Sequence, residues 1–124
     1  MIVEITETVL PGGHISYDWL MKKAKSVFKH KVDEYSKKIE VKVERIAVKH
    51  LKNRWGSMTK EGSISLNVNL LKSPEDVIDY IILHELCHFK IKEYSHHYWD
   101  YVRKYMPKYE ENIEWLKING SHLI

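Results

Sequence analysis

Residues 73–91, with the sequence SPEDVIDYIILHELCHFKI, constrain the fold of this chain more than any other stretch. Ser73 is expected to cap a helix, Pro74 to occupy its first position, and Glu75 and Asp76 to meet the positive end of its dipole. The helix that follows is apolar nearly all round, which is typical of a helix buried on most sides. Its apolar residues are Val77, Ile78, Ile81, Ile82, Leu83, Leu86 and Phe89.

This apolar helix carries the motif His-Glu-x-x-His. His84 and His88 stand one helical turn apart, so both imidazoles can bind one zinc ion. Glu85 can take a proton from an attacking water and pass it to a leaving amine. The alternative is an ordinary helix that contains these residues by chance. Burying three polar side chains without partners would cost about 1–3 kcal/mol each, which favours the metal site.

The pattern of apolar residues elsewhere predicts a single α+β domain over residues 1–124. Apolar residues at helical spacing indicate a long N-terminal helix over residues 16–39, capped by Ser16. Two-residue alternation indicates a strand over residues 39–48, with a bulge at the point where the alternation shifts. The other expected elements are a strand at 2–9 with a turn at 10–14, strands at 63–70 and 53–58 joined by a turn at 59–62, and short helices at 95–106 and 108–117 separated by Pro107.

Composition and charge argue against several classes of protein. With 44% hydrophobic and 30% charged residues, the chain is expected to be soluble and folded. Its first residues lack the basic start and apolar run of a signal peptide, and no apolar stretch has the length of a membrane span. A single cysteine, Cys87, forms no internal disulfide, which favours the cytoplasm. The net charge of +3 leaves nucleic-acid binding open, but the lysines form no tight basic patch that would indicate it.

Three sequence blocks agree in order and spacing with one known family. They are RWGS at residues 54–57, the HELCH helix, and SHHYW at residues 95–99, in a helix that ends before a proline. Over roughly residues 40–117 the chain resembles the YgjP-like metal-dependent hydrolases, which are zincin-fold relatives of the SprT-type proteases. The resemblance implies a small zincin-like domain with a twisted, mostly antiparallel sheet over the metal helix. The family's activity is mostly a predicted peptidase activity, so the expected substrate is a peptide or protein of a kind that the resemblance does not specify, and the expected cofactor is the zinc ion of the motif.

The chain departs from this family at the third metal ligand. The family usually has a histidine six residues after the second motif histidine, and this sequence has Tyr94 there. His97 is the preferred replacement, because helical side chains lean toward the N-terminus and its ring could reach the same place. Tyr94 could bind as a phenolate, and His96 is a further choice. Glu110 or Glu111 of the last helix is the remaining alternative.

The RWGS block is expected to bind the substrate. In a zincin-like fold a strand edge at the cleft pairs with an extended peptide, and Gly56 would let that peptide approach closely. Arg54 could hold a carbonyl or carboxylate group, and Trp55 and Ser57 complete the block. In the alternative interpretation, Trp55 belongs to the core and Arg54 pairs with a surface acid.

Two further features are interpreted as parts of the hydrophobic core. The aromatic stripe that contains Tyr98, Trp99 and Tyr105 has helical spacing, which is more typical of a buried face than of a surface that stacks on bases. Cys87 points away from both motif histidines and is interpreted as a small buried hydrophobe.

Two hypotheses about function follow from these patterns. The first is a zinc peptidase in which Glu85 activates water. The second is a non-catalytic metal-binding or nucleic-acid-associated module, which the departure at Tyr94 keeps open. The first is favoured, because a structural zinc site needs no carboxylate placed to deprotonate water.

Overall fold

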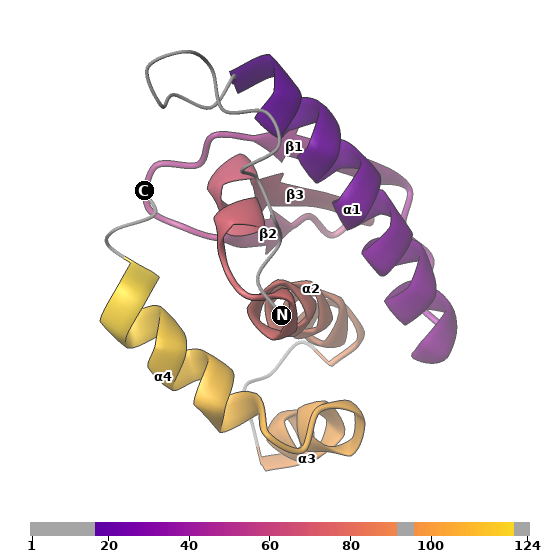
Figure 1. The fold of residues 1–124 in the computed structure, drawn as a ribbon. Coiled ribbons are helices and arrows are strands. Elements are labelled where there is room, and N and C mark those ends of the chain that lie inside the picture. Colours follow the sequence, from indigo (N-terminus) through magenta and orange to yellow (C-terminus); the bar gives the residue numbers. More distant parts are fainter. Residues whose placement is uncertain (1–16, 92–95, 121–124) are drawn as a thin grey trace.

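The computed structural model describes residues 17–91 and 96–120. The predicted α+β class is confirmed, since helices pack with a small sheet (Figure 1). Helix α2 is central: it contacts α1, α3, α4 and strand β2. The elements in chain order are α1 (Tyr17–Lys38), β1 (Arg45–Lys49), β2 (Gly56–Met58), β3 (Ser63–Asn67), the 3-10 helix η2 (Val68–Lys72), α2 (Glu75–Lys90), α3 (His96–Tyr105) and α4 (Tyr109–Asn119).

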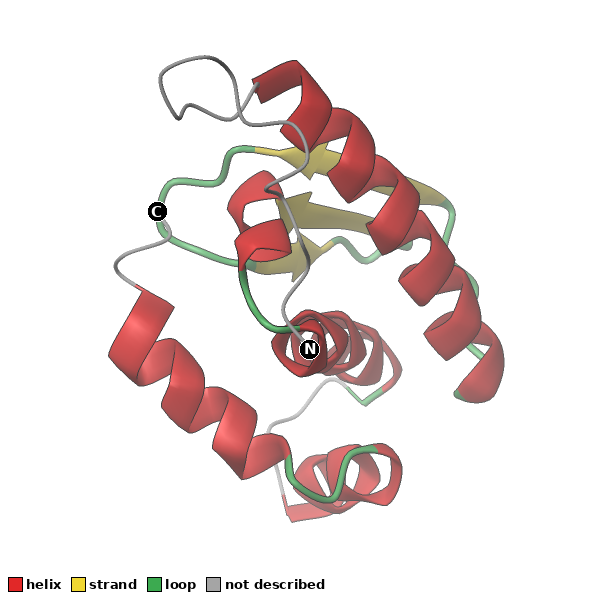
Figure 2. Ribbon diagram, viewed as in Figure 1, coloured by secondary structure: helices red, strands yellow, loops and turns green. Residues whose placement is uncertain are grey.

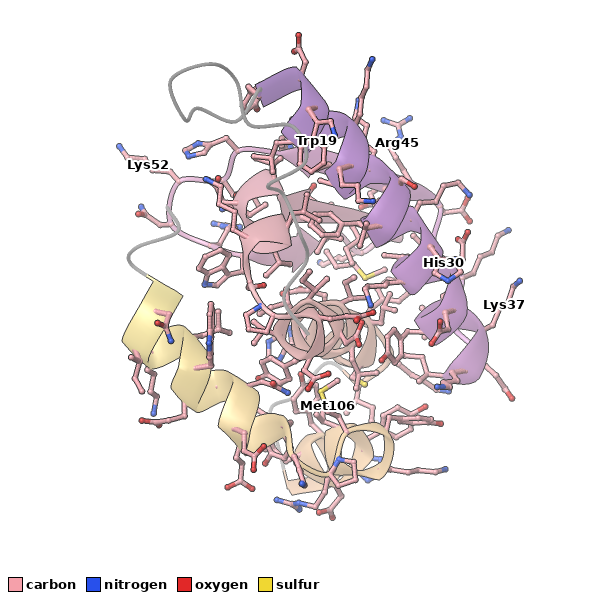
Figure 3. All side chains as sticks on the ribbon, viewed as in Figure 1. Trp19, His30, Lys37, Arg45, Lys52 and Met106 are labelled. Atoms are coloured by element: carbon pink, nitrogen blue, oxygen red, sulfur yellow. The ribbon has the colours of Figure 1, made fainter. Side chains whose placement is uncertain are left out.

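The predicted long helix over residues 16–39 is confirmed as α1. One face packs into the core and the other is wet, as expected of an amphipathic helix. His30 and Lys37 project from the exposed face (Figure 3). The predicted cap Ser16 lies outside the described residues. The buried face consists of Leu20, Ala24, Phe28, Lys31 and Val32.

The predicted strand over residues 39–48 is wrong in its first half, because β1 begins only at Arg45. The chain must first leave α1, and the amides of Ile39 and Val41 still donate to carbonyl groups in the last turn of that helix. Between them, Glu40 takes a φ of 58°, a conformation that reverses the chain. The apolar residues Ile39, Val41 and Val43 therefore belong to an irregular segment that packs against the core. Because this segment is not a strand, the shift in alternation before β1 is not a β-bulge.

The described sheet is mixed and not mostly antiparallel (Figure 2). Its order is β1-β3-β2, with β1 parallel to β3 and β2 antiparallel to β3. After β1 the chain crosses to the opposite edge of the sheet, where it forms β2. It then turns back and forms β3, the middle strand. The predicted turn at 59–62 is confirmed: the Gly62 amide donates to the Thr59 carbonyl at 3.1 Å, and Gly62 has a φ of 95°, which suits glycine. Strand β2 is thus an edge strand of the described sheet.

Strand β3 ends at Asn67, earlier than the predicted strand over 63–70. The Asn67 side chain directs this change, because its Oδ1 accepts from the Asn69 amide at 3.0 Å and caps η2. Its Nδ2 donates to the carbonyls of Leu51 at 2.9 Å and Arg54 at 3.0 Å. One buried amide therefore ends β3 and also holds the loop that leads into β2.

Helix α2 begins at Glu75, and the predicted capping role of Ser73 is wrong. The Ser73 hydroxyl donates to the Leu70 carbonyl at 2.6 Å, at the end of η2, and α2 has no side-chain cap. Lys31 of α1 anchors the start of α2, with its Nζ 3.0 Å from Glu75 and 2.6 Å from Asp79. The predicted burial of the helix is confirmed by its buried residues, which are Val77, Ile78, Tyr80, Ile81, Ile82, Leu83, Leu86 and Cys87.

The two C-terminal helices are confirmed, and Pro107 lies between them as predicted. Tyr98 and Val102 of α3 are fully buried, so the aromatic stripe is part of the core. The predicted strand at 2–9, the turn at 10–14 and Ser95 lie outside the described residues. Among the helices of the described ranges, none is long and apolar enough to cross a membrane.

Candidate active site

The two histidines of the motif lie together on the side of α2 that faces α3. The rings of His84 and His88 both meet the ring of Tyr98 edge-on, with centroid distances of 5.8 Å and 6.2 Å. Tyr98 comes from the first turns of α3 and fills the space beside both imidazoles. The helical spacing of the motif thus places both predicted ligands against one buried ring.

Aromatic rings surround His84 and keep its imidazole neutral. The rings of Tyr80, Tyr98 and Trp99 lie 5.7, 5.8 and 6.4 Å from its own ring, centroid to centroid. Burial in this environment, together with the nearby charge of His88, lowers the pKa of His84 to about 4. His84 is therefore uncharged at pH 7, which is the state in which an imidazole nitrogen binds a metal ion.

The hydroxyl of Tyr98 contacts His84 at two atoms. It lies 2.8 Å from Nδ1 of the ring and 3.1 Å from the backbone carbonyl of the same residue. Sequence reasoning assigns Tyr98 to the core and misses this contact. The signal that could have revealed it is the hydroxyl itself, since a buried tyrosine usually needs a hydrogen-bond partner.

Glu85 lies against strand β2. Its Cγ is 3.4 Å from the position that a Cβ would take on Gly56, so the missing side chain of that glycine leaves room for the glutamate. Burial raises the pKa of the Glu85 carboxyl, and the charge of Arg54 partly opposes this rise. The structure thus brings Glu85 together with two residues of the RWGS block. A carboxyl with a raised pKa is better suited to exchange protons near neutral pH.

The remaining residues of the RWGS block have different surroundings. Ser57 is paired with Ser65 across β2 and β3. Trp55 is half-buried against the core, and its indole lies 3.3 Å from the Cβ position of Gly120 at the end of α4. Trp55 is therefore placed as the core interpretation describes, whereas Arg54 is exposed beside Glu85.

A small cavity of about 200 Å³ lies between the end of β2 and the last turns of α2. It connects the edge strand with the second histidine of the motif. The lining residues are Met58, Thr59, Lys60, His88 and Phe89.

His84 and His88 are suited to serve as two ligands of one metal ion, because both are imidazoles on one face of α2. Within the side chains that the structure describes, no group of three or more His, Cys, Asp or Glu could hold a metal. His97 is exposed in the first turn of α3. Tyr94 and the side chain of His96 lie outside the described residues.

The glutamates of α4 are placed less favourably for the role of third ligand. The side chain of Glu110 is 72% exposed and its carboxylate lies 3.6 Å from the guanidinium of Arg103. Glu111 is also exposed.

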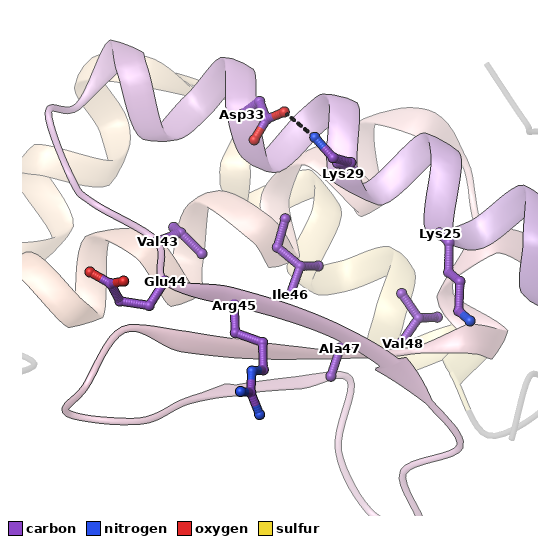
Figure 4. A pocket seen from close by; sticks show the side chains of 9 residues that line it. All are labelled: Lys25, Lys29, Asp33, Val43, Glu44, Arg45, Ile46, Ala47 and Val48. Carbon is purple, nitrogen blue, oxygen red and sulfur yellow. Dashed lines mark hydrogen bonds and ion pairs between the residues drawn. The ribbon is translucent and has the colours of Figure 1, made fainter.

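A larger cavity, of about 650 Å³, lies between α1 and β1 (Figure 4). Ile46 and Val48 point from β1 toward α1, and the rim carries charges of both signs, with Lys29 bonded to Asp33 at 3.2 Å. No residue of the motif or of the RWGS block lines it, so it is not the candidate site. Its lining residues are Lys25, Lys29, Asp33, Val43, Glu44, Arg45, Ile46, Ala47 and Val48.

Comparison with known proteins relates this geometry to a family. The family described as "YgjP-like, metallopeptidase domain" matches residues 13–119. The structure of the metallopeptidase zymogen jannalysin of Methanocaldococcus jannaschii is 32% identical, with a TM-score of 0.64 over 78% of this chain and 97% of that chain. The abylysin zymogen of Pyrococcus abyssi is 21% identical and shares the fold, with a TM-score of 0.65 over 76% and 93% of the two chains.

A comparison with functionally curated proteins gives no match. The family match covers most of the chain, including all three sequence blocks. A metallopeptidase requires a metal ion and acts on peptide or protein substrates. The chain belongs to the YgjP-like family of metallopeptidase domains.

Proposed function

We propose that the protein is a zinc-dependent peptidase whose site lies between α2 and the edge of β2. The contact of Glu85 with Gly56 carries this proposal, because it places the carboxyl group of the motif at a strand edge. His84 and His88 lie on the same helix, one turn apart. The proton acceptor, the metal ligands and a surface for an extended substrate are therefore neighbours.

Zinc is proposed to bind His84, His88 and a third group at the start of α3 or just before it. His97 and Tyr94 are the candidates for that group, followed by His96. Two imidazoles and a third protein ligand with one open position are typical of catalytic zinc sites. When bound, zinc lowers the pKa of a water molecule and polarises the carbonyl of the scissile bond.

Glu85 is proposed to act as the general base and then the general acid. It accepts a proton from the attacking water and delivers it to the nitrogen of the leaving amine. Burial raises its pKa, which makes its carboxylate a stronger base, and the charge of Arg54 opposes part of this rise. The position of Glu85 against a glycine restricts its side chain on the side of the sheet.

The substrate is proposed to lie extended along β2. Only one side of this strand is paired within the described sheet, so its other side can offer backbone groups to a peptide. Arg54 would hold a carbonyl or carboxylate of the substrate, and Gly56 and Ser57 would face its backbone. The cavity beside His88 would take a side chain of the peptide. Trp55 supports the strand from the core side.

Metal content tests the site. Protein purified without added metal is expected to contain about one zinc per chain, and His84→Ala to contain much less. His30→Ala is the matched control, because His30 lies exposed on α1 and its loss should leave the zinc content unchanged. Equal zinc in wild type and His84→Ala would contradict the proposal.

Cleavage of an unfolded protein tests the chemistry. Glu85→Gln is expected to keep the zinc and to lower the cleavage rate by about 10²–10⁴-fold, because an amide of the same size accepts no proton from water. Both solved relatives are described as zymogens, so the assay should include protein before and after prolonged incubation. Zinc binding without cleavage under either condition would support a non-catalytic metal-binding module instead.

A further inference from the structure

Tyr98 of α3 lies against the first histidine of the motif, and the one polar group of its side chain is the hydroxyl. The side chain is fully buried. Its oxygen lies 2.8 Å from Nδ1 of His84 and 3.1 Å from the His84 carbonyl. Both contacts go to one residue, so the hydroxyl bridges the ring of His84 to its own backbone.

The chemistry of these two contacts determines where the protons lie. A backbone carbonyl can only accept, so the single proton of the Tyr98 hydroxyl is directed to the His84 carbonyl. With its proton directed there, the hydroxyl oxygen presents a lone pair to the ring, an arrangement that fits Nδ1–H as the donor of the 2.8 Å contact. A neutral imidazole has one N–H, so Nε2 has the lone pair that a metal requires.

We propose that Tyr98 is a positioning residue for the metal: it holds His84 in the Nδ1–H tautomer and fixes the direction of its ring. The inference rests on the proposed function, since it takes His84 as a zinc ligand. Edge-on contacts with the rings of both His84 and His88 leave the Tyr98 side chain little freedom to turn. Partners that orient a metal-binding histidine in this way contribute about 10–100-fold to metal affinity.

Zinc affinity is the first test, measured by competition with a chelator of known affinity. Tyr98→Phe removes one oxygen atom and keeps the ring, so we expect zinc to bind about 10–100-fold more weakly. Tyr109→Phe is the matched control. Tyr109 is also buried and its ring stacks on that of Trp99 at 5.3 Å, but its hydroxyl accepts from Arg103 at 3.3 Å and not from His84. The control should bind zinc as tightly as the wild type.

The tautomer of His84 is the second test, and a merely structural role of Tyr98 would not affect it. Nitrogen NMR shifts of labelled histidine in the zinc-free protein at pH 7.5 distinguish Nδ1–H from Nε2–H. We expect the Nδ1–H form in the wild type and a shift toward Nε2–H in Tyr98→Phe. His84→Ala identifies the signal.

The outcomes separate this inference from the proposed function. If His84→Ala binds zinc as well as the wild type, the proposed function fails. If His84 is needed for zinc but Tyr98→Phe binds within twofold of the control, only the role of Tyr98 is overturned. An Nε2–H tautomer in the wild type also overturns it, and this measurement does not depend on whether Tyr98→Phe folds.

Discussion

Gly56 and Glu85 are in contact across the boundary between the sheet and the motif helix. A Cβ added to Gly56 would lie 3.4 Å from Cγ of Glu85, 3.3 Å from the carbonyl oxygen of Ser65 and 3.3 Å from Cδ2 of Leu66. A side chain at residue 56 would require these neighbours to shift by a few tenths of an ångström, so glycine favours this close approach of the edge strand to α2. This contact brings the RWGS block and the HELCH block together in the fold.

Replacement of Gly56 by alanine is therefore expected to slow peptide cleavage by about 10-fold or more while zinc content stays unchanged. The new methyl group meets a backbone oxygen that cannot easily yield, so β2 or Glu85 must move. Ser65→Ala is the control on the neighbouring strand and should cleave at the wild-type rate. Equal cleavage rates in Gly56→Ala and wild type would show that the contact is not needed for catalysis.

Substitutions between α2 and α3 should identify the third zinc ligand. Zinc affinity is expected to fall most in His97→Ala, because a neutral imidazole binds zinc at pH 7 without first losing a proton, as a tyrosine must. The exposed ring of His97 would have to turn toward the motif when the metal binds. A larger loss in Tyr94→Phe or His96→Ala would assign the ligand to that residue. No loss in any of the three would direct attention to Glu110 and Glu111.

Lys31 is expected to stabilise the packing of α1 on α2. Its ammonium group is largely buried and contacts Glu75 and Asp79, so Lys31→Met should lower the free energy of unfolding by about 1–3 kcal/mol. Lys29→Met removes an exposed pair on the same helix and should cost about 0.5 kcal/mol or less. Urea unfolding of both variants measures the difference. Equal losses would show that burial of the Lys31 pair contributes nothing extra.

The contribution of Lys31 should also depend on pH in a defined direction. Burial disfavours its charge, but the hydrogen bonds and charges of Asp79 and Glu75 outweigh burial and raise its pKa above 10.5. A raised folded pKa stabilises the protein fully below the unfolded pKa, and this stability is lost as the pH rises through the folded pKa. The difference in unfolding free energy between wild type and Lys31→Met should thus be constant near neutral pH and shrink above pH 10.5. A difference that shrinks already between about pH 7 and 9 would contradict this assignment.

Cys87 is expected to resist alkylation in the folded protein. Its side chain is fully buried, and burial raises the pKa of the thiol to about 12, with Lys90 opposing this only in part. An alkylating reagent at pH 8 should therefore modify the native protein no faster than the protein unfolds. The same protein in denaturant should be modified completely and quickly. Fast modification without denaturant would show that the core around α2 opens readily.

Features that depend on neighbouring residues can be predicted from the order of amino acids. The spacing of apolar residues predicts α1 and the buried helix α2, because side chains at three- and four-residue steps share one helical face. The same rule places His84 and His88 together. The turn at 59–62 follows from Gly62, and the order of the three blocks indicates the family.

The places where distant segments meet depend on the packing of the whole fold. The alternation after residue 39 predicts a strand, but the end of α1 uses those backbone groups first, and Asn67 ends β3 through bonds to a loop that local sequence does not specify. The parallel pairing of β1 with β3 depends on a crossover, and the contacts of Tyr98 with His84 and of Lys31 with Asp79 join different helices. Such contacts form only when the core brings the elements together, because hydrophobic burial is non-directional and periodicity shows which face is buried but not its partner.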